Sequence, residues 1–388
     1  MADTIALPAS SSPRLSLIVI AYQAGLVEAC LRALAAHPPR QVPFELIVVL
    51  NAVPAAEVDA LAARAPGVRF ARSAANRGMA GAGNLGRSLA SGELLLFLHD
   101  DVEVEPDCLD ALVAALDAHP EAGAVGPKVL NLDGTLQFAG NIIFADGTTW
   151  VSWVGDPPPA DAFAEPRPVD YNGTSTLLVR AATFDAAGGF DDRYYPVFYV
   201  DVDLAMAIRA LGQVVWYEPR AHTRHHRGAS SSSRFRDFVL GCNRAAFVAK
   251  WGGALDRHEP AGERTPELLE RAMARARVWA DEVARGAARA EAPPAAEHLS
   301  DERAYLEREV SLWQAFGARL EGELAAAQEA FVAMRETAHI AAGAANAWEA
   351  EALAARAREQ AVREDLAAAL SRERSADDAA AAAAETAS

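Results

Sequence analysis

Short apolar runs alternate with helical stretches from Leu15 to about Val129, and this alternation constrains the fold more than any other feature. Strand, helix and strand in succession require right-handed crossovers, which place helices on both faces of a mostly parallel sheet. The sequence therefore predicts an α/β domain. The predicted strands are Leu15–Ala21, Phe44–Leu50, Val68–Ala71, Glu93–Leu98 and Ala124–Val129, and the predicted helices are Leu26–Ala36, Ala55–Ala65, Met79–Ala90 and Asp107–Ala118.

One predicted strand ends abruptly in polar residues. The run Leu95–Leu98 is followed by His99, Asp100 and Asp101. Ligands of open α/β sheets bind beyond the carboxyl ends of the strands, and carboxylates there can hold a divalent cation against a phosphate-bearing ligand. A polar loop whose acids cap the next helix is the alternative, and this segment alone does not decide between them.

Composition excludes some classes of function. The net charge of −17 over 388 residues argues against a nucleic-acid surface, although it leaves nucleotide ligands open. The cysteine count of 3, without paired spacing, fits a reducing compartment. No apolar stretch is long enough to span a bilayer, and the amino-terminal residues lack the pattern of a signal peptide. We expect a cytoplasmic location.

Beyond residue 130 the pattern changes. The runs Gln137–Phe144 and Thr148–Val154 flank Asp146-Gly147, which predicts a hairpin. A long polar loop is predicted over Pro157–Pro168. Further predicted elements are the strands Ser175–Val179 and Gln213–Tyr217 and the helix Asp203–Ala210.

A domain boundary is predicted near Trp251–Arg264, where the composition shifts to Ala, Glu and Arg. Thr265-Pro266 is a favourable helix start. From Leu306 onward apolar and small residues recur at alternating spacings of four and three, which indicates a heptad seam; a solvated single helix is the alternative. The predicted parts are a disordered leader (1–14), the α/β domain (15–255), a helical, coiled-coil-like extension (265–378) and a disordered tail (379–388).

Three polar segments have two interpretations each when taken alone. The Gly/Ala-rich turn 76–86 could admit an anion at a helix N-terminus or simply allow tight packing, and it is neither a Walker loop nor a dinucleotide fingerprint. Asp201 and Asp203 could cap a helix or face a cleft. The basic run 222–228 could bind a metal or phosphate, or be a surface cluster.

The order of these motifs is informative where each motif alone is not. From residue 15 to about 251 the chain closely resembles family 2 glycosyltransferases with the GT-A fold, and within them the rhamnosyltransferase-type branch. The motifs that carry the resemblance are Tyr22, Asn51, the turn 76–86, Leu98–Asp101, Asn172-Gly173, Gly188–Asp191, Asp201–Leu204 and His225-His226.

The resemblance implies roles for individual residues. It implies that Asp201 is the catalytic base and that Asp101 and His225 lie at a divalent metal, either Mg or Mn. The residues implied in donor binding are Tyr22, Asn51, Asn76, Gly78, Asn84 and Asp100. The chain departs from the family pattern at Ala21 and Gln23, at Leu50 and Val200, which replace acids, and at His99, which replaces Asp or Asn.

The implied activity is transfer of a sugar from a nucleotide-sugar donor to a glycan or lipid-linked acceptor by an inverting single displacement. Peripheral membrane contact and homo-oligomerisation through the C-terminal helices are further expectations, and no nucleic-acid partner is expected. One alternative is a degraded transferase domain that acts as a scaffold through its helical tail. A nucleotidyltransferase is disfavoured, because no Gly-rich loop bearing Lys or Arg follows the first strand.

Overall fold

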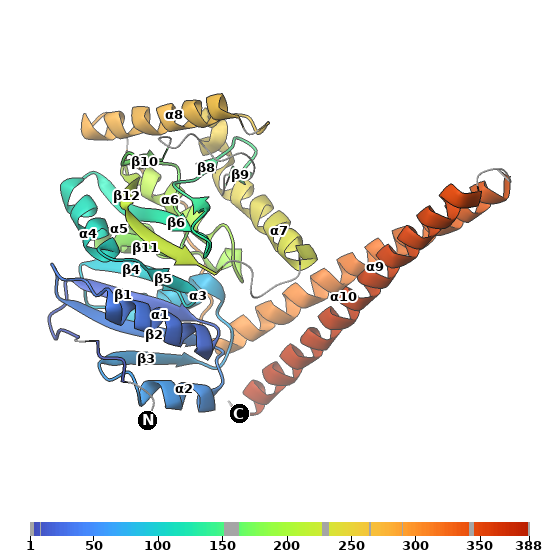
Figure 1. Cartoon of the computed structure of the whole chain (residues 1–388), viewed down its shortest axis with the longest axis horizontal. Helices are drawn as coiled ribbons and strands as arrows, with labels where there is room; N and C mark the ends of the chain where they lie inside the picture. The colour runs from blue at the N-terminus through green and yellow to red at the C-terminus, as the bar shows by residue number, and fades with distance from the viewer. Residues whose placement is uncertain are drawn as a thin grey trace. The chain divides into compact units, whose positions relative to one another are not determined.

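The computed structural model describes residues 4–7, 9–150, 163–226, 233–263, 265–288, 290–340 and 345–386. The chain divides into two compact units, Met1–Leu299 and Ser300–Ser388. The first unit is built around a central sheet, and the second consists of two long helices (Figure 1).

The central sheet is mixed. Strands β1 (Leu15–Ala21), β2 (Phe44–Asn51), β3 (Val68–Ser73) and β4 (Leu94–His99) run parallel to one another. Strand β11 (Thr176–Arg180) is antiparallel to β4 and to β6 (Ala122–Leu130). The predicted sheet was mostly parallel, and β11 is the main departure. The order of strands in the sheet is β10 (Arg167–Val169), β12 (Val214–His225), β6, β11, β4, β1, β2 and β3. Strand β5 (Val102–Val104) pairs with β12, and β7 (Leu136–Phe138) pairs with β6.

Helices cover both faces of the sheet, as the sequence predicts. In β1 the side chains of Ile18 and Ile20 enter one core, and those of Leu17 and Val19 enter the other. Strands buried on both faces read as continuous apolar runs, which explains why they were recognisable. One face carries α1 (Ala24–Ala36), α2 (Ala55–Ala62) and α4 (Cys108–Ala118), and the other carries α3 (Gly78–Leu89), α5 (Ala181–Ala186), α6 (Val200–Ala210), α7 (Ser233–Trp251) and the start of α8 (Pro266–Ala284).

The strand order reverses between β1 and β4. The chain proceeds from β1 to β2 and β3 in one direction, and β4 then lies on the other side of β1. Such a reversal opens a crevice at the carboxyl ends of the strands. Tyr22 follows β1 there, and His99 ends β4. Because β11 is antiparallel, its beginning lies at the same edge, where the His99 N–H donates to the Ser175 carbonyl at 3.1 Å.

The predicted hairpin is present but shorter. Strands β8 (Ile142–Ile143) and β9 (Thr149–Trp150) pair antiparallel, and the Phe144 N–H donates to the Thr148 carbonyl at 2.8 Å. Residues 151–162 lie outside the described residues and include the first half of the predicted loop. The end of that predicted loop is strand β10. Strand β12 extends well past its predicted end to His225.

The ends of the first unit are more ordered than predicted. In the segment predicted as a disordered leader, Ile5 and Leu7 are buried, and the Ile5 N–H donates to the Arg64 carbonyl at 2.7 Å. At the other end, Leu268 and Leu269 of α8 pack into the core. The structure therefore divides at Leu299 rather than near Trp251–Arg264, since α8 is amphipathic and buries its apolar side on the sheet domain.

The second unit is an antiparallel helical hairpin of α9 (Glu302–Ile340) and α10 (Ala345–Thr386) (Figure 1). In α10 the buried side chains recur every seven residues, at Ala355, Val362, Ala369 and Ala376. This spacing agrees with the predicted seam, although coiled-coil packing stays a prediction. Helix α10 continues to Thr386, so most of the predicted disordered tail is helical, as its alanine content favours. No described helix is both long and apolar enough to cross a membrane.

Candidate active site

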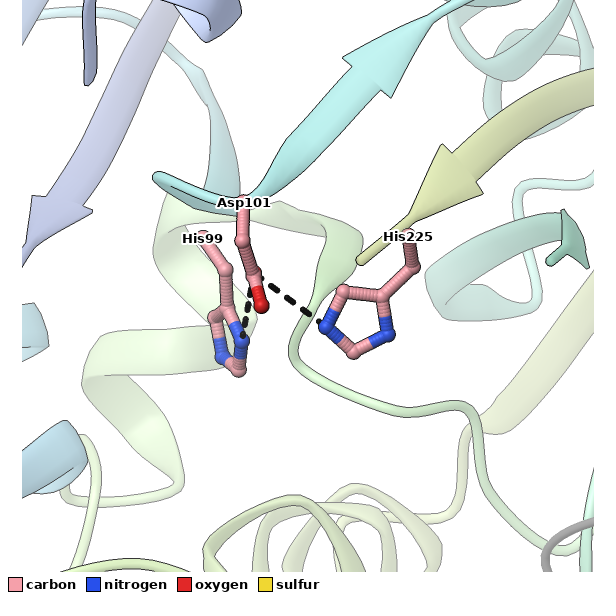
Figure 2. Close-up of side chains that lie close together, drawn as sticks. All are labelled: His99, Asp101 and His225. Carbon is pink, nitrogen blue, oxygen red and sulfur yellow. Dashed lines mark ion pairs between the residues drawn. The ribbon is translucent and has the colours of Figure 1, made fainter. Parts of the chain in front are cut away.

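Three side chains meet at the carboxyl edge of β4. Within the described residues, His99, Asp101 and His225 form a group whose potential ligand atoms all lie within 4.8 Å of one another. Asp101 Oδ1 lies 3.2 Å from His225 Nε2 and 3.9 Å from His99 Nδ1. Figure 2 shows the carboxylate between the two imidazole rings. The structure thus brings together Asp101 and His225, the two residues predicted to lie at a metal, and adds His99.

The end of β4 and the turn after it bring two of these residues together. His99 is the last residue of β4, and the turn at Asp100 and Asp101 places the Asp101 carboxylate beside the His99 ring (Figure 2). His225 reaches them from the opposite direction, because the end of β12 pairs antiparallel with β5 and places His225 opposite Val102. The His226 N–H also donates to the Asp101 carbonyl at 2.9 Å.

A directional chain of hydrogen bonds orients His225. The Asp133 carboxylate can only accept, so the Thr135 hydroxyl donates to it at 2.6 Å. The Thr135 oxygen then accepts from Asn131 Nδ2 at 2.9 Å. Asn131 Oδ1 accepts from Gln137 Nε2 at 2.9 Å. Gln137 Oε1 is left to accept from His225 Nδ1 at 2.7 Å. Nε2 of a neutral His225 is therefore a bare lone pair.

That lone pair faces the Asp101 carboxylate. Two acceptors 3.2 Å apart repel unless a proton or a cation lies between them. His99 adds a second unsatisfied group, because its buried Nε2 has no hydrogen-bond partner. One carboxylate and two imidazoles with uncommitted lone pairs are a donor set that suits a divalent metal. The residues present therefore fit the metal that the resemblance implies.

Burial and neighbouring charge set the protonation states of the group. Burial lowers the pKa of His99 to about 4, so that its ring is neutral near neutral pH. Burial alone would raise the pKa of Asp101, but the neighbouring imidazole groups, His225 first and then His99, outweigh burial and hold that pKa below its usual value. An ionised carboxylate and a neutral imidazole are the forms that ligate metals.

Asp100 points away from this group and organises the turn after β1. Its Oδ2 accepts from the backbone N–H groups of Tyr22 at 2.7 Å and Gln23 at 2.9 Å. Burial raises the pKa of Asp100 to about 6, against the effect of these two hydrogen bonds. Asp100 therefore fixes the β1–α1 turn at the crevice by binding the backbone of Tyr22 rather than its side chain.

The predicted donor-binding residues of β2 and α3 form a second cluster. Asn51 Nδ2 donates to Asn76 Oδ1 at 3.0 Å, and Asn51 Oδ1 accepts from the Arg77 N–H at 2.7 Å. Asn76 Oδ1 also accepts from the Gly78 N–H at 3.0 Å. Gly78 has a φ of 62°, and a β-carbon there would lie 2.6 Å from the Pro196 oxygen. A close backbone contact therefore requires glycine at this position.

Asn84 lies farther along α3 and is committed elsewhere. Its Nδ2 donates to the Phe190 carbonyl at 2.8 Å, and its Oδ1 accepts from the Phe190 N–H at 2.9 Å. Its side chain therefore ties α3 to the turn before η1 (Asp192–Tyr194). This structural role accounts for Asn84 without a ligand.

Asp201 lies in the first turn of α6, close to Gly173. A β-carbon at Gly173 would lie 3.7 Å from Asp201 Oδ2, which is ordinary van der Waals contact, and 3.1 Å from the Phe138 ring of β7, which is tight. Gln137, the partner of His225, immediately precedes Phe138. Asp201 Oδ1 accepts from the Val202 N–H at 3.0 Å, and burial raises the pKa of Asp201 to about 6. That value suits a carboxylate that takes up a proton.

The segment before Asp201 is strained and braced by α7. Phe198 and Tyr199 both adopt left-handed backbone conformations, with φ of 69° and 66°, which non-glycine residues rarely occupy. Asn243 of α7 donates from Nδ2 to the carbonyls of Val197 at 2.8 Å and Phe198 at 3.2 Å. The brace holds the turn that presents Asp201.

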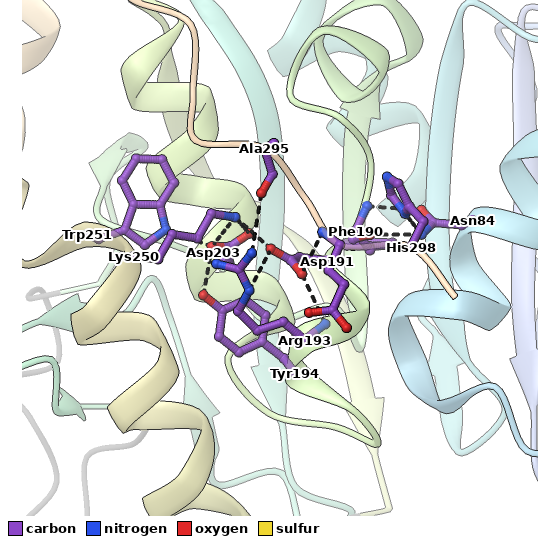
Figure 3. Close-up of polar contacts among 11 residues, drawn as sticks. Asn84, Phe190, Asp191, Arg193, Tyr194, Asp203, Lys250, Trp251, Ala295 and His298 are labelled. Atoms are coloured by element: carbon purple, nitrogen blue, oxygen red, sulfur yellow. Dashed lines mark hydrogen bonds and ion pairs between the residues drawn. The ribbon is translucent and has the colours of Figure 1, made fainter. Parts of the chain in front are cut away.

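Asp203 lies in a buried ionic network rather than in the crevice (Figure 3). Lys250 Nζ lies 2.9 Å from the Asp203 carboxylate and 2.8 Å from Asp191 Oδ2. Tyr194 and Trp251 also donate to Asp203, at 2.9 Å and 2.6 Å. The supporting role predicted for Asp203 agrees with these contacts.

Sequence reasoning missed several residues of this site. Gln137 lies 88 positions before His225, and nothing in the sequence connects the two. Asn243 and Lys250 are on α7, which was not predicted as an element. His99 was treated as a departure from a family pattern, and its nearness to Asp101 depends on the turn that follows β4.

The sequence matches known proteins over part of its length. Residues 16–181 match the model of the family described as glycosyl transferase family 2. The chain is 37% identical over 147 residues to the O-antigen biosynthesis protein RfbC of Myxococcus xanthus, across 36% of this chain but only 11% of that protein. It is 29% identical over 213 residues to an N-acetylglucosaminyl-diphospho-decaprenol L-rhamnosyltransferase of Mycobacterium tuberculosis, across 49% of this chain and 68% of that protein.

Solved structures give weaker matches. GalNAc-T7 with UDP, GalNAc and Mn²⁺ matches with a TM-score of 0.49 and 14% identity, over 63% of this chain and 50% of that chain. The mannosyltransferase PcManGT of Pyrobaculum calidifontis with GDP-Man and Mn²⁺ matches with a TM-score of 0.46 and 19% identity, over 74% of this chain and 77% of that chain.

Proposed function

The chain belongs to glycosyltransferase family 2 through residues 16–181, and from this premise we propose that it transfers a sugar from a nucleotide-sugar donor to a glycan or lipid-linked acceptor. The observation that carries the proposal is the group of His99, Asp101 and His225 at the strand-order reversal, with Asp201 across Gly173 from β7. The similarity to an L-rhamnosyltransferase favours a deoxyhexose donor and a lipid-linked acceptor.

Asp201 is the proposed base of an inverting single displacement. The acceptor hydroxyl attacks C1 of the donor sugar and its proton passes to the Asp201 carboxylate. The new oxygen–carbon bond forms as the bond from C1 to the diphosphate oxygen breaks, and the nucleoside diphosphate leaves with the bonding electrons. Base catalysis of this kind contributes roughly a hundred- to ten-thousand-fold.

Asp101 and His225 are the proposed protein ligands of a divalent ion, Mg²⁺ or Mn²⁺. Such an ion, when bound, offsets the negative charge that builds on a departing diphosphate. The hydrogen-bond chain from Asp133 to Gln137 keeps His225 in the form that can ligate. The unpaired acceptors around Asp101 support this assignment.

The proposed donor site combines direct and indirect contacts. Tyr22, Asn51, Asn76 and Gly78 line the carboxyl edge beside the metal group and are proposed to contact the nucleotide. Asp100 and Asn84 act through the backbone that they hold, at Tyr22 and Phe190 respectively. The comparisons give no support to the alternative of a degraded scaffold protein.

We also propose a cytoplasmic location and self-association. The three cysteines are unpaired, which fits a reducing compartment. The heptad spacing of Ala355, Val362, Ala369 and Ala376 supports an assembly of C-terminal helices. Peripheral contact with a membrane would follow if the acceptor is lipid-linked.

The test of the activity is release of nucleoside diphosphate from a panel of nucleotide sugars, with and without a divalent ion. Asp101→Ala is expected to abolish metal-dependent turnover while the protein stays folded, because removing a metal ligand costs several kcal/mol of transition-state stabilisation. Asp117→Ala is the matched control, since Asp117 is a partly exposed acid paired with Arg14 at the opposite end of β1. Near wild-type turnover in Asp101→Ala would contradict the metal role.

A further inference from the structure

We infer that His99 is a third protein ligand of the proposed metal site, and that two imidazoles with one carboxylate make this site select first-row transition cations over Mg²⁺. The inference rests on the proposed function, since it concerns the same ion. It goes beyond that function because it assigns a role to a residue at which the chain departs from the family pattern.

The position of His99 is the first argument. His99 ends β4, and its ring lies beside the carboxylate of Asp101, which is in the turn that follows (Figure 2). Its Nδ1 lies 3.9 Å from Asp101 Oδ1, and its ring lies edge-on to that of His225, with centroids 5.9 Å apart (Figure 2). Two ligands on opposite sides of one ion lie about 4 Å apart when each bond is about 2.0–2.2 Å. The observed separations, all within 4.8 Å, are close to that span.

The lack of another use for His99 is the second argument. Its Nε2 is buried without a hydrogen-bond partner, which is rare for a native polar group and calls for an explanation. The ring packs at the strand end with only 23% of its side chain exposed. The nitrogen that faces the Asp101 carboxylate is Nδ1, and a neutral ring that carries its proton on Nε2 can offer Nδ1 as a metal ligand. The low pKa that burial gives His99 agrees with this form.

The chemistry of the donor set then decides the class of ion. Mg²⁺ prefers oxygen ligands in near-ideal octahedral geometry and usually binds through carboxylates and water. Imidazole suits the later first-row ions, whose affinities rise from Mn²⁺ through Co²⁺. With His99 the site offers two nitrogens for one carboxylate, whereas an aspartate at position 99 would reverse this ratio. Position 99 is therefore the residue that sets the metal preference.

The experiment measures binding of the metal alone to the full chain by calorimetry, with Co²⁺, Mn²⁺ and Mg²⁺ as separate probes. We expect wild type to bind Co²⁺ most tightly and Mg²⁺ least, with a span on the order of tenfold or more. Loss of a hydrogen bond that only supports a metal ligand costs roughly 10–100-fold in metal affinity. His99→Ala removes a ligand itself, so it should weaken Co²⁺ binding by at least that factor. His99→Asp should reduce the ratio of Co²⁺ affinity to Mg²⁺ affinity, because it replaces a nitrogen ligand by an oxygen ligand. The visible absorption of bound Co²⁺ reports nitrogen ligation independently of activity.

His37→Ala is the matched control, because His37 caps the far end of α1 from the site. Equal Co²⁺ affinity in wild type and His99→Ala would overturn the inference. So would an unchanged Co²⁺-to-Mg²⁺ ratio in His99→Asp. In either case, loss of binding in Asp101→Ala would leave the proposed metal function standing. Absence of metal binding in wild type would overturn the inference, and turnover that survives chelation would then separately contradict the metal role in the proposed function.

Discussion

The two acids at the start of α6 have opposite surroundings, and a pair of variants separates their roles. Asp201 accepts a hydrogen bond from a backbone N–H and lies close to Gly173, whereas Asp203 is surrounded by Lys250 and two aromatic donors. Asp201→Asn keeps the shape and removes the proton acceptor. It should lower kcat by roughly a hundred- to ten-thousand-fold while donor affinity, measured by calorimetry, stays nearly constant.

Asp203→Asn is the matched control at the same helix turn. It removes one of the two carboxylates that pair with the buried Lys250, so it should lower the melting temperature more than it lowers kcat. The reverse pattern in the two variants would show that the base is the other carboxylate.

The raised pKa of Asp201 predicts the pH dependence of the reaction. The carboxyl group can accept a proton only when ionised, so kcat should rise with pH through about 6, the pKa that burial gives this group. Tyr171 and Tyr199 face Asp201, and both have raised pKa values, so they remain neutral in this range. Steady-state rates measured from about pH 5 to about pH 8 check this expectation.

The same shift has a consequence for stability with a definite sign. The folded pKa lies above the unfolded value of about 3.9, so the folded state holds its proton longer. The free energy of unfolding should therefore fall as pH rises from about 4 to about 6 and then stay level. Asp100 has a similarly raised pKa and contributes its own decrease, so Asp201→Asn, which cannot ionise at this position, should show a smaller decrease than wild type when unfolding by urea is compared at the two ends. An identical pH profile in both proteins would exclude the raised pKa.

Site residues were predictable where they follow buried strands, and not where they depend on distant partners. Asp101 ends a long apolar run, and the resemblance placed His225 beside it. Gln137 orients His225, and Asn243 holds the turn before α6; both act through side-chain hydrogen bonds to residues far away in the sequence. No local pattern encodes such a bond, since an isolated amide in a polar segment has many other uses.

At the scale of elements, α7 is the part that sequence patterns failed to reveal and that the site depends on. It mixes charged with apolar residues, and its buried stripe is narrow, formed by Phe238, Val239, Asn243, Phe247 and Trp251. By contrast, β1, β2 and β4 were predicted closely, because burial on both faces leaves long apolar runs. Strand β12 was underestimated, since its last third turns polar where it leaves the core to pair with β5.

The brace that α7 provides can be tested at Asn243. Asn243→Ala removes a donor from the carbonyls of Tyr194, Val197 and Phe198, each at 3.2 Å or less. Leaving buried acceptors unpaired costs about 1–3 kcal/mol of unfolding free energy. Because these carbonyls belong to the strained turn before Asp201, kcat should fall by more than donor affinity does, measured on protein that is fully folded.

Arg236→Ala is the control on the same helix, because Arg236 is exposed and pairs only weakly with Asp237. It should change neither stability nor kcat appreciably. An Asn243→Ala protein that loses stability but keeps wild-type kcat would restrict Asn243 to a purely structural role.

At the scale of the whole molecule, the boundary between the units was placed too early because composition changes before packing does. The segment after Trp251 becomes rich in Ala, Glu and Arg, yet α8 buries Leu268 and Leu269 in the core of the sheet domain. Arg275 of α8 also lies 2.5 Å from the buried Asp170 beside β10. An amphipathic helix on a sheet and a free helical extension share one composition, and only the packing distinguishes them.

The connection beyond α8 also belongs to the sheet domain. The Glu297 N–H donates to Asp191 Oδ1 at 3.0 Å, and the Leu299 N–H donates to Asp192 Oδ2 at 2.9 Å. Figure 3 shows this extended segment beside the network of Asp191 and Lys250. The residues up to Leu299 therefore support the turn that leads to α6 and its proposed base.

Two truncations test this boundary. A chain that ends at Leu299 should keep the unfolding free energy and the donor affinity of the first unit. A chain that ends at Glu263 loses the burial of Leu268 and Leu269, which is worth about 1.5–3 kcal/mol each, and should unfold at markedly lower urea concentration. Light scattering on the full chain and the Leu299 chain reports whether α9 and α10 mediate self-association. Equal stability of the two truncated chains would place the boundary before α8. The same number of chains per particle with and without the hairpin would show that its heptad seam serves only the contact between α9 and α10.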